Sequence, residues 1–297
     1  MDAQTISIGV PVYNEEETLV QSLESIVKGV LELEQKSNII LCFNGTTDHG
    51  RDLAENFSNK IYPLEIISSP KGKPSAVKAI ANHSNRDILI YVDADVIVNK
   101  SCFKNIINLF SSDVMAVTGR PIPYTSNNLV SNILNARMSH PGIEISKSGG
   151  SKPFLHGRIY AIRKSILGKI DQDFSDAIGD DTFLSHYLLL NYGKDSIACC
   201  HNANVQYQPA TSVKSWWNKW SRIWQDLDNL YKNHPEFLPV KNSVKTKIDW
   251  KNVPARDIPL FLCERVLHYG GKTYFNIIKN YKETKWIRLE DTKKVRL

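Results

Sequence analysis

Two pairs of carboxylates are the residues in this sequence best placed to do chemistry. Asp93 and Asp95 form a D-x-D directly after the apolar run at residues 88–92. Mg²⁺ or Mn²⁺ takes one or two protein carboxylates and fills its other positions with water and phosphate oxygens. Such an ion would neutralise a departing diphosphate. The alternative is a pair of loop aspartates that cap the next helix, but the apolar strand in front favours the metal site.

The second pair, Asp180 and Asp181, begins a predicted helix that runs to about residue 190. Acidic residues are favoured in a first helical turn by the helix dipole, so a structural role is as good an interpretation as a chemical one. In the chemical interpretation, one of them is a general base that deprotonates an acceptor hydroxyl, a role worth about 10² to 10⁴ in rate. The basic turn Lys71-Gly72-Lys73-Pro74 precedes another helix and suits a phosphate.

Short apolar strands and amphipathic helices alternate along the chain and would position these residues. The alternation predicts an α/β fold with a mostly parallel sheet and helices on both faces. Asn14, three residues before Glu17, is the predicted cap of the first helix. We predict strands at residues 5–12, 38–43, 64–67, 87–92, 114–118, 157–162 and 197–200. We predict further helices at about residues 48–57, 75–83, 101–110, 180–190, 213–231 and 257–269, and a mobile loop over the site at residues 127–153.

Ligands of such open sheets bind beyond the carboxyl ends of the strands. Tyr13, Asn44 and Asp93 all follow predicted strands, so three strand ends should converge on one polar edge. The first turn lacks the G-x-G-x-x-G pattern of dinucleotide-binding domains, which argues against a dinucleotide ligand. The glycine-rich phosphate loop that an NTP:sugar nucleotidyltransferase would need near the N-terminus is missing too.

Charge and composition divide the chain into two parts. With 297 residues and 42% hydrophobic composition, it is long enough for one large domain with an appendage. Residues 201–297 carry 18 Lys and Arg against 9 Asp and Glu, whereas residues 1–200 carry 19 against 22. We predict a catalytic domain at residues 1–210 and a helical, basic, Trp-rich extension at residues 211–297. The basic extension favours an anionic partner or is simply a solvated surface.

No stretch approaches 18 uncharged apolar residues, and the N-terminus shows no signal pattern. We therefore expect a cytoplasmic protein, at most peripheral at a membrane. The tryptophans of residues 213–231 are interpreted first as core, although a membrane-interface helix or an acceptor groove would also suit them. Nucleic acid is not an expected partner.

In this order, the segments resemble the GT-A-type (Rossmann-like) glycosyltransferases of family 2. The opening ISIGVPVYNEEETLVQSLESI is similar to the family's first strand and helix, and FNGTTDHG at residues 43–50 to its D-D-G-S-T-D-G-T turn. KGKPSAVKAIA resembles the segment beside the diphosphate, YVDADV the D-x-D strand, and GRIYAIRKS the acceptor-side segment. GDDTFLSHYLLLNYG resembles the helix that carries the catalytic base. The resemblance covers residues 5–225.

The resemblance implies an inverting, metal-assisted transfer of a single sugar from a nucleoside diphosphate sugar. By position, Asp181 is the base and Asp180 replaces the family's Glu. Asp93 and Asp95 would hold Mg²⁺ or Mn²⁺, and Arg222 would assist the leaving group or the acceptor. The residues expected at the donor are Pro11, Tyr13, Glu15 and Asn44 beside the nucleoside, and Lys73 and Asp93 beside the phosphates.

Two departures from the family pattern limit what the resemblance implies. Phe43 and Asn44 stand where the family usually has an Asp that reads uracil, so a UDP donor does not follow. Lys219, Arg222 and Ile223 replace the Q-x-x-R-W of polymer-forming members, which favours single-sugar transfer. The acceptor is left open between a lipid-linked sugar, a polysaccharide, a peptide and a small metabolite. The alternative function is a catalytically idle nucleotide-sugar-binding or scaffold subunit that acts through its basic C-terminal region.

Overall fold

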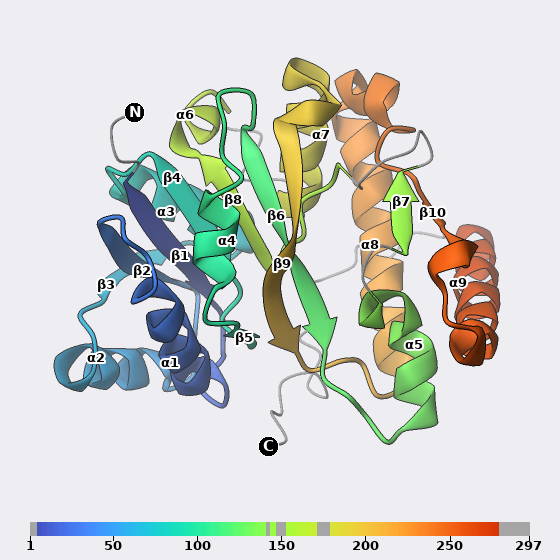
Figure 1. Cartoon of the computed structure of the whole chain (residues 1–297), viewed down its shortest axis with the longest axis horizontal. Coiled ribbons are helices and arrows are strands. Elements are labelled where there is room, and N and C mark those ends of the chain that lie inside the picture. The colour runs from blue at the N-terminus through green and yellow to red at the C-terminus, as the bar shows by residue number, and fades with distance from the viewer. Residues whose placement is uncertain (1–4, 141–142, 147–152, 171–178, 279–297) are drawn as a thin grey trace.

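The computed structural model describes residues 5–140, 143–146, 153–170 and 179–278 (Figure 1). Strands and helices alternate strictly from β1 to β4, as the sequence predicts, and less regularly from there to β9. The strands are β1 (Ile6–Val12), β2 (Ser37–Asn44), β3 (Glu65–Ser69), β4 (Ile88–Val92), β5 (Val96–Val98), β6 (Ala116–Pro123), β7 (Glu144–Ser146), β8 (Ile159–Arg163), β9 (Ile197–Tyr207) and β10 (Thr246–Ile248). The helices are α1 (Leu19–Val30), α2 (Gly50–Lys60), α3 (Lys73–His83), α4 (Cys102–Ile107), α5 (Leu129–Ser139), α6 (Lys164–Leu167), α7 (Asp180–Tyr192), α8 (Val213–Asn233) and α9 (Ile258–Ile278).

Eight strands form one sheet in the order β3-β2-β1-β4-β8-β6-β9-β5. The strands from β3 to β4 are parallel to one another, and β6 is parallel to β9. Strand β8 is antiparallel to both β4 and β6, so its first residue, Ile159, pairs with the last residue of β4, Val92. The mostly parallel α/β fold predicted from the sequence is confirmed. The loop before β8 therefore reaches the edge where β1, β2 and β4 end.

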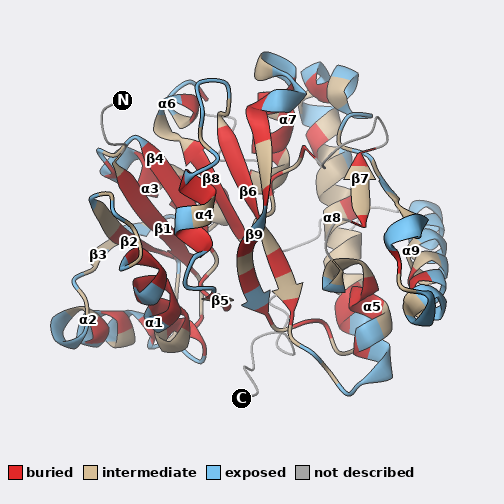
Figure 2. Cartoon of the chain, in the orientation of Figure 1, coloured by how far each residue is buried: buried red, intermediate tan, exposed pale blue. Residues whose placement is uncertain are grey.

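Both faces of the sheet are buried, which explains why its strands are continuous apolar runs. In β4, Ile88, Ile90 and Val92 pack into the cluster that contains α1, α2 and α4, whereas Leu89 and Tyr91 pack into the cluster that contains α3 and α7. Figure 2 shows the inner strands in the colour for buried residues, with exposed residues on the outer helices and loops. The sheet is therefore a rigid support for the loops at its edge.

The C-terminal helices pack together through aromatic rings. Trp216 and Trp224 of α8 are 3% and 4% exposed and share a cluster with Leu134 of α5 and Phe275 of α9. For these two tryptophans the core interpretation is confirmed. Leu230, near the end of α8, belongs instead to the cluster beneath the sheet. Helix α8 thus contacts both parts of the fold, and a domain boundary at residue 210 stays a prediction.

The predicted helix cap at Asn14 is wrong. Helix α1 begins at Leu19, with Thr18 as its N-cap residue. Asn14 has a φ of 53°, a left-handed conformation that Asn adopts more readily than most residues. Its side-chain oxygen accepts a hydrogen bond of 2.8 Å from the backbone N–H of Thr47. Asn14 therefore joins the loop after β1 to the loop after β2.

The mobile loop predicted at residues 127–153 is also wrong for the described part of that segment. It contains α5, whose N-cap residue Asn128 accepts hydrogen bonds from the backbone of Val130 and Ser131. It also contains β7, which pairs antiparallel with the distant strand β10. Helix α5 packs against α8 and α9. These elements depend on partners far along the chain, which local periodicity does not reveal.

Candidate active site

The residues predicted to border the nucleoside lie at the ends of β1 and β2. Nδ2 of Asn44 donates a hydrogen bond of 3.0 Å to the carbonyl oxygen of Val12, which ties the two strand ends together. Tyr13 is half-buried, and Nζ of Lys71 lies 4.8 Å from the centre of its ring. Pro11 is buried within β1. Of this set, Tyr13 is the side chain with a surface open to a ligand.

Glu15, another predicted nucleoside contact, is 6% exposed. Oγ1 of Thr18 lies 3.2 Å from Oε2 of Glu15 and 3.4 Å from the carbonyl oxygen of Ala94. Ala94 is the middle residue of the D-x-D. Glu15 and Thr18 therefore connect the loop after β1 to the loop that carries the two aspartates.

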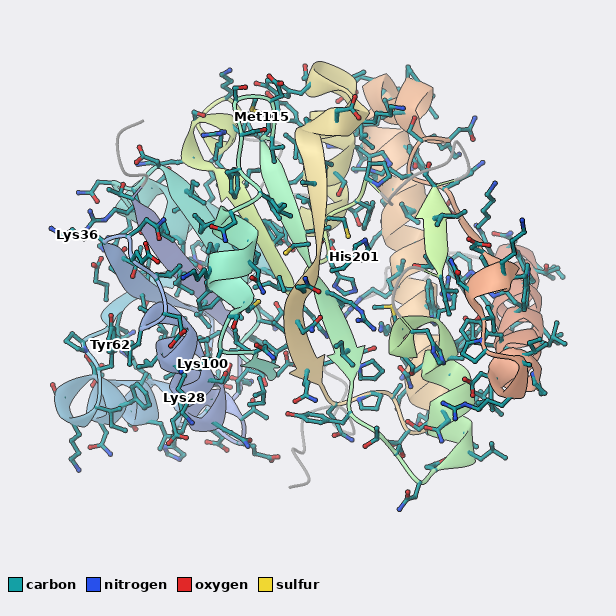
Figure 3. All side chains as sticks on the ribbon, viewed as in Figure 1. Lys28, Lys36, Tyr62, Lys100, Met115 and His201 are labelled. Carbon is teal, nitrogen blue, oxygen red and sulfur yellow. The ribbon has the colours of Figure 1, made fainter. Side chains whose placement is uncertain are left out.

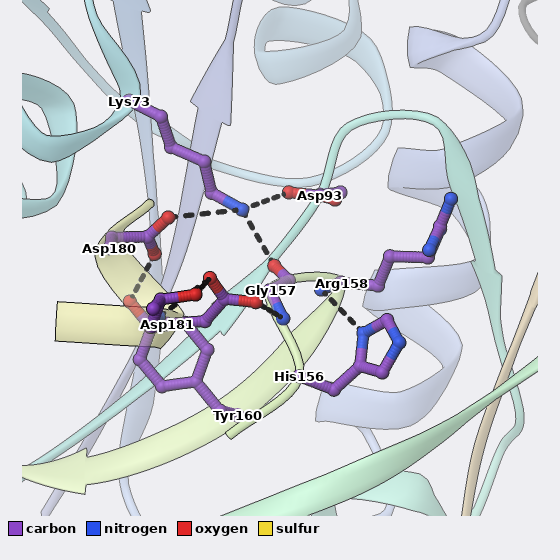
Figure 4. A network of polar contacts seen from close by, with 9 residues as sticks. Lys73, Asp93, His156, Gly157, Arg158, Tyr160, Asp180 and Asp181 are labelled. Atoms are coloured by element: carbon purple, nitrogen blue, oxygen red, sulfur yellow. Dashed lines mark hydrogen bonds and ion pairs between the residues drawn. The ribbon is translucent and has the colours of Figure 1, made fainter. Parts of the chain in front are cut away.

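Lys73 lies at the centre of the polar network in Figure 4. Its Nζ is 2.6 Å from Oδ1 of Asp93, 2.6 Å from the carbonyl oxygen of Gly157 and 3.8 Å from Oδ1 of Asp180. These groups come from the start of α3, the residue after β4, the loop before β8 and the first turn of α7. One ammonium group thus joins four segments that are far apart in the sequence.

Burial and charge set the protonation states in this network. Burial acts to lower the pKa of Lys73, but the carboxylates of Asp180 and Asp93 outweigh it and raise the pKa above its usual value. Burial raises the pKa of Asp93; Lys73 opposes this rise and Asp95 reinforces it. Burial also raises the pKa of Asp180, again against Lys73, with Asp181 adding to the rise. Lys73 is therefore the largest charge that opposes the rise in the pKa of both carboxyls.

Asp180 and Asp181 are adjacent but have different surroundings. Asp180 is 3% exposed, and its Oδ2 accepts a hydrogen bond of 2.7 Å from the hydroxyl of Tyr160. Asp181 is half-buried; its Oδ2 accepts from the backbone N–H of Gly157 at 2.8 Å, and its Oδ1 from that of Thr182 at 2.8 Å. Asp180 is enclosed, whereas Asp181 keeps part of its surface exposed.

Gly157 joins the two carboxylate pairs through its backbone alone. Its carbonyl accepts from Lys73, and its N–H donates to Asp181. A methyl group on Gly157 would lie 2.9 Å from Oδ2 of Asp181 and 3.5 Å from Nζ of Lys73. The sequence placed Gly157 and Tyr160 in the segment that resembles the family's acceptor side but gave neither residue a role of its own. Their contacts with Lys73, Asp180 and Asp181 are long-range and leave no local pattern in the sequence.

Asp93 and Asp95 are the residues that fit a divalent cation. The charge of Asp95 raises the pKa of Asp93, so the two carboxylates are close enough to repel each other. Among the described residues, no group of three or more His, Cys, Asp or Glu side chains could hold a metal ion. Two carboxylates meet the needs of Mg²⁺ or Mn²⁺ where phosphate oxygens and water complete the coordination.

A second group of cations consists of Arg158, Lys219 and Arg222, which we call the cation cluster. Arg158 directly follows Gly157, and its guanidinium carbon lies 3.7 Å from the centre of the Tyr207 ring. In the view of Figure 4, Arg158 and Lys73 lie on opposite sides of Asp93. Lys219 and Arg222 are half-buried on α8. Burial, Arg158 and Arg222 lower the pKa of Lys219 to about 7.

Arg222 is coupled to the predicted base by charge. Burial lowers the pKa of Arg222, whereas Asp226 and Asp181 act to raise it. Burial raises the pKa of Asp226 to about 7 against the effect of Arg222. Within the described residues, Oδ1 of Asp226 is buried without a hydrogen-bond partner. The fold thus brings Arg222 into electrostatic range of Asp181, although their side chains form no ion pair in the described part of the chain.

Comparison with known proteins identifies the family. The profile of glycosyl transferase family 2 matches residues 7–171, a span from β1 to beyond β8 that includes both aspartates of the D-x-D. The chain therefore belongs to glycosyl transferase family 2, the family that its motifs resemble.

Curated relatives match parts of larger proteins. Over 94 residues, the chain is 35% identical to the undecaprenyl-phosphate 4-deoxy-4-formamido-L-arabinose transferase of Proteus mirabilis, covering 31% of this chain and 29% of that protein. It is 25% identical to the minor teichoic acid biosynthesis protein GgaA of Bacillus subtilis, covering 72% of this chain and 50% of the relative. The chain is 24% identical to the minor teichoic acid biosynthesis protein GgaB of the same species, and the match covers 82% of this chain and 29% of GgaB. The chain spans at most half the length of these three relatives.

Solved structures share the fold. Glucosyl-3-phosphoglycerate synthase from Mycobacterium tuberculosis, in complex with Mn²⁺, UDP-glucose and phosphoglyceric acid, superposes with a TM-score of 0.53 at 16% identity, over 77% of this chain and 79% of that one. A mannosyltransferase from Pyrobaculum calidifontis, in complex with GDP-mannose and Mn²⁺, superposes with a TM-score of 0.58 at 15% identity. The superposition covers 94% of this chain and 76% of the mannosyltransferase. These likenesses confirm the GT-A fold.

The predictions about membranes are tested only in part. Among the residues that the structure describes, no helix combines the length and the hydrophobicity needed to cross a bilayer. Figure 3 shows side chains that end in nitrogen or oxygen around the outline of the molecule and labels Lys28, Lys36 and Lys100. Contact with a membrane surface stays a prediction.

Proposed function

We propose that the chain is an inverting glycosyltransferase of the hexosyltransferase type, which moves a single sugar from a nucleoside diphosphate sugar to an acceptor nucleophile. The observation that supports this most strongly is the Lys73 network. In it, Asp93 of the D-x-D and Asp181 of α7 are both held by the Lys73–Gly157 pair. Binding a nucleotide sugar alone would not need the second carboxylate, so the network favours catalysis over an idle subunit.

Asp181 is the proposed general base. One backbone N–H holds each of its oxygens, which orients the carboxylate and leaves lone pairs free to accept a proton. The acceptor oxygen then attacks the anomeric carbon on the face opposite the diphosphate, and the configuration inverts. Asp180 is a positioning residue, because it is enclosed between Tyr160 and Lys73.

Asp93 and Asp95 would hold Mg²⁺ or Mn²⁺, which would stabilise the charge of the departing diphosphate. Both solved structures compared above contain Mn²⁺ together with a nucleotide sugar. The repulsion between Asp93 and Asp95 also supports the assignment, since a cation would relieve it. In the same proposal, Lys73 faces the donor phosphates, and the residues at the nucleoside are Pro11, Tyr13, Glu15 and Asn44.

The donor base and the acceptor class are the open parts of the proposal. The two structural neighbours contain UDP-glucose and GDP-mannose. The curated relatives are named for undecaprenyl phosphate and for minor teichoic acid. Lipid-linked sugars, polysaccharides, peptides and small metabolites are therefore all included in the acceptor screen. A lipid-linked acceptor would also require peripheral contact with a membrane.

The first test is a thermal-shift and hydrolysis screen of UDP-, GDP- and dTDP-sugars, each with and without Mn²⁺. We expect one nucleotide to stabilise the protein, and to do so more strongly with the metal. A protein that no nucleotide stabilises under either condition would contradict the proposal.

The second test is Asp181→Asn, with the donor and acceptor that the screens select. Because the amide keeps the shape of the carboxylate but is not a base, transfer should fall about 10² to 10⁴-fold. Affinity for the nucleoside diphosphate should change by no more than a few-fold. Asp113→Asn, at an exposed loop residue, is the matched control and should retain full activity. Transfer at the wild-type rate in the Asp181 variant would refute the assigned base.

A further inference from the structure

The cation cluster is positioned by the half of the sheet that follows the D-x-D. The guanidinium of Arg158 stacks on Tyr207, the last residue of β9. Tyr207 pairs with Val96, the residue directly after Asp95. The backbone carbonyl of Arg158 also accepts a hydrogen bond of 3.1 Å from the N–H of Asp93. Arg158 is therefore fixed beside both aspartates of the D-x-D.

Lys219 and Arg222 bring two more cations to this place. They are three residues apart on α8 and so lie on one face of the helix. Burial and Arg158 lower the pKa of Arg222, whereas Asp226 and Asp181 act to raise it, so all three side chains lie within electrostatic range of its guanidinium. The cluster therefore reaches the neighbourhood of the proposed base.

The cluster differs from Arg137 in forming no ion pair among the described residues, although Asp95 acts on the pKa of Lys219 and both Asp181 and Asp226 act on that of Arg222. Arg137, for comparison, forms ion pairs of 2.9 Å with Glu144 and 3.1 Å with Glu264. Within the described ranges, Arg158, Lys219 and Arg222 form no ion pair. Partly desolvated cations that repel one another are costly unless an anion joins them. The depressed pKa of Lys219 is a consequence of this crowding.

The donor diphosphate does not account for this charge. A divalent cation on Asp93 and Asp95 would neutralise much of its charge, and Lys71 lies on the same side, over Tyr13. The strands that form the nucleoside edge, from β3 to β4, are on one side of the sheet, whereas Arg158 directly precedes β8 and Tyr207 ends β9, on the other side of β4. The cluster is therefore left for the second substrate.

We propose that Arg158, Lys219 and Arg222 bind a phosphate group of the acceptor. This inference rests on the proposed function, since it assigns the acceptor side of the same site. Arg222 would place the phosphate near Asp181, so that an acceptor hydroxyl a few bonds away reaches the base. Arginine is well suited to this task because its planar guanidinium donates two parallel hydrogen bonds to phosphate.

The test is a calorimetric titration of protein saturated with Mn²⁺ and the nucleoside diphosphate from the donor screen, so that the donor site is filled. The probes are glycerol 3-phosphate, dihexanoyl phosphatidic acid below its micelle concentration, and neutral glycerol. We expect both phosphates to bind and glycerol not to bind. A phosphatidic acid that binds at least tenfold more tightly than glycerol 3-phosphate assigns a lipid source, and equal affinities assign a free phosphorylated acceptor.

Lys219→Gln and Arg222→Gln should each weaken phosphate binding about tenfold while leaving nucleoside diphosphate affinity within twofold. Arg222→Lys should recover part of the loss, and an unchanged thermal midpoint shows that the variants fold. Lys214→Gln removes an exposed charge from the same helix and is the matched control.

Three results would overturn the inference: no phosphate binding while the nucleoside diphosphate binds, weakened nucleoside diphosphate binding in both Gln variants, or an equal loss in Lys214→Gln. Failure of every nucleoside diphosphate to bind would instead refute the proposed function, and the inference with it.

Discussion

Lys73 and Lys219 both lie within electrostatic range of the D-x-D, and their surroundings shift their pKa values in opposite directions. Asp93 and Asp180 raise the pKa of Lys73, whereas burial together with Arg158 and Arg222 lowers that of Lys219 to about 7. The first lysine has its counter-charges within the chain. The second is surrounded mainly by other cations. This difference separates a finished structural network from a site that an external anion completes.

The largest effect in the Lys73 network is expected from Gly157→Ala. The added methyl would lie 2.9 Å from the carboxylate of Asp181 and would displace the base. Because a shift of about 1 Å in a catalytic group costs about 10²-fold in rate, we expect kcat to fall about 10²-fold. Steady-state kinetics would measure this. Gly168→Ala is the matched control, since the nearest atom to its added methyl is 4.0 Å away. Activity within twofold of wild type in the Gly157 variant would mean that the network does not position the base.

Removing the central charge should destabilise the protein. In Lys73→Met, the carboxylates of Asp93 and Asp180 lose the cation that they share. We expect the free energy of unfolding to fall by about 2 kcal/mol. This loss is smaller than that for a fully buried ion pair because Lys73 and Asp93 are partly exposed. Urea unfolding measures the change. Lys71→Met removes a lysine from the same turn and is the matched control. It should lower the free energy of unfolding by much less than Lys73→Met.

The pH dependence of the Lys73 variant sharpens this test. Burial raises the pKa values of Asp93 and Asp180, and without the lysine they rise further. A carboxyl with a raised folded-state pKa binds protons more readily in the native than in the unfolded state, so the variant's deficit should shrink as the pH falls from 8 to 5. A deficit that does not change with pH would show that the loss comes from packing rather than charge.

The smallest expected effect concerns the cation cluster, the site that an external anion would complete. Lys219 faces Arg158, Arg222, Arg137 and Asp95, and it is charged only below a pH of about 7. Sulfate stays a dianion from pH 6 to 8, so its affinity should fall about fivefold over that range if bound sulfate raises the pKa of Lys219 by about one unit. Calorimetry with the nucleoside diphosphate present measures this. Lys219→Met should abolish the pH dependence of sulfate affinity. If the affinity of this variant still falls with pH as in the wild type, another group causes the pH dependence.

The sequence predicted the strand and the helix that hold the four aspartates because each of these elements depends on a local pattern of residues. The D-x-D follows the buried strand β4, and Asp180 and Asp181 begin α7 as predicted. The roles of the individual residues stay predictions. The Asn14 cap and the loop at residues 127–153 were wrong because a long-range hydrogen bond and distant packing partners decided those conformations.

The order of apolar and polar residues alone determined the alternation of strands and helices, the α/β class and the identity of the acidic residues at strand and helix ends, since periodicity and strand length are local properties. Only the tertiary structure decided that β8 runs antiparallel beside β4 and so brings Gly157, Arg158 and Tyr160 to the aspartates. Strand order is a property of the whole sheet, set by the burial of both its faces. For the same physical reason, only the fold distinguished the enclosed Asp180 from the partly exposed Asp181 and placed Lys219 and Arg222 beside them.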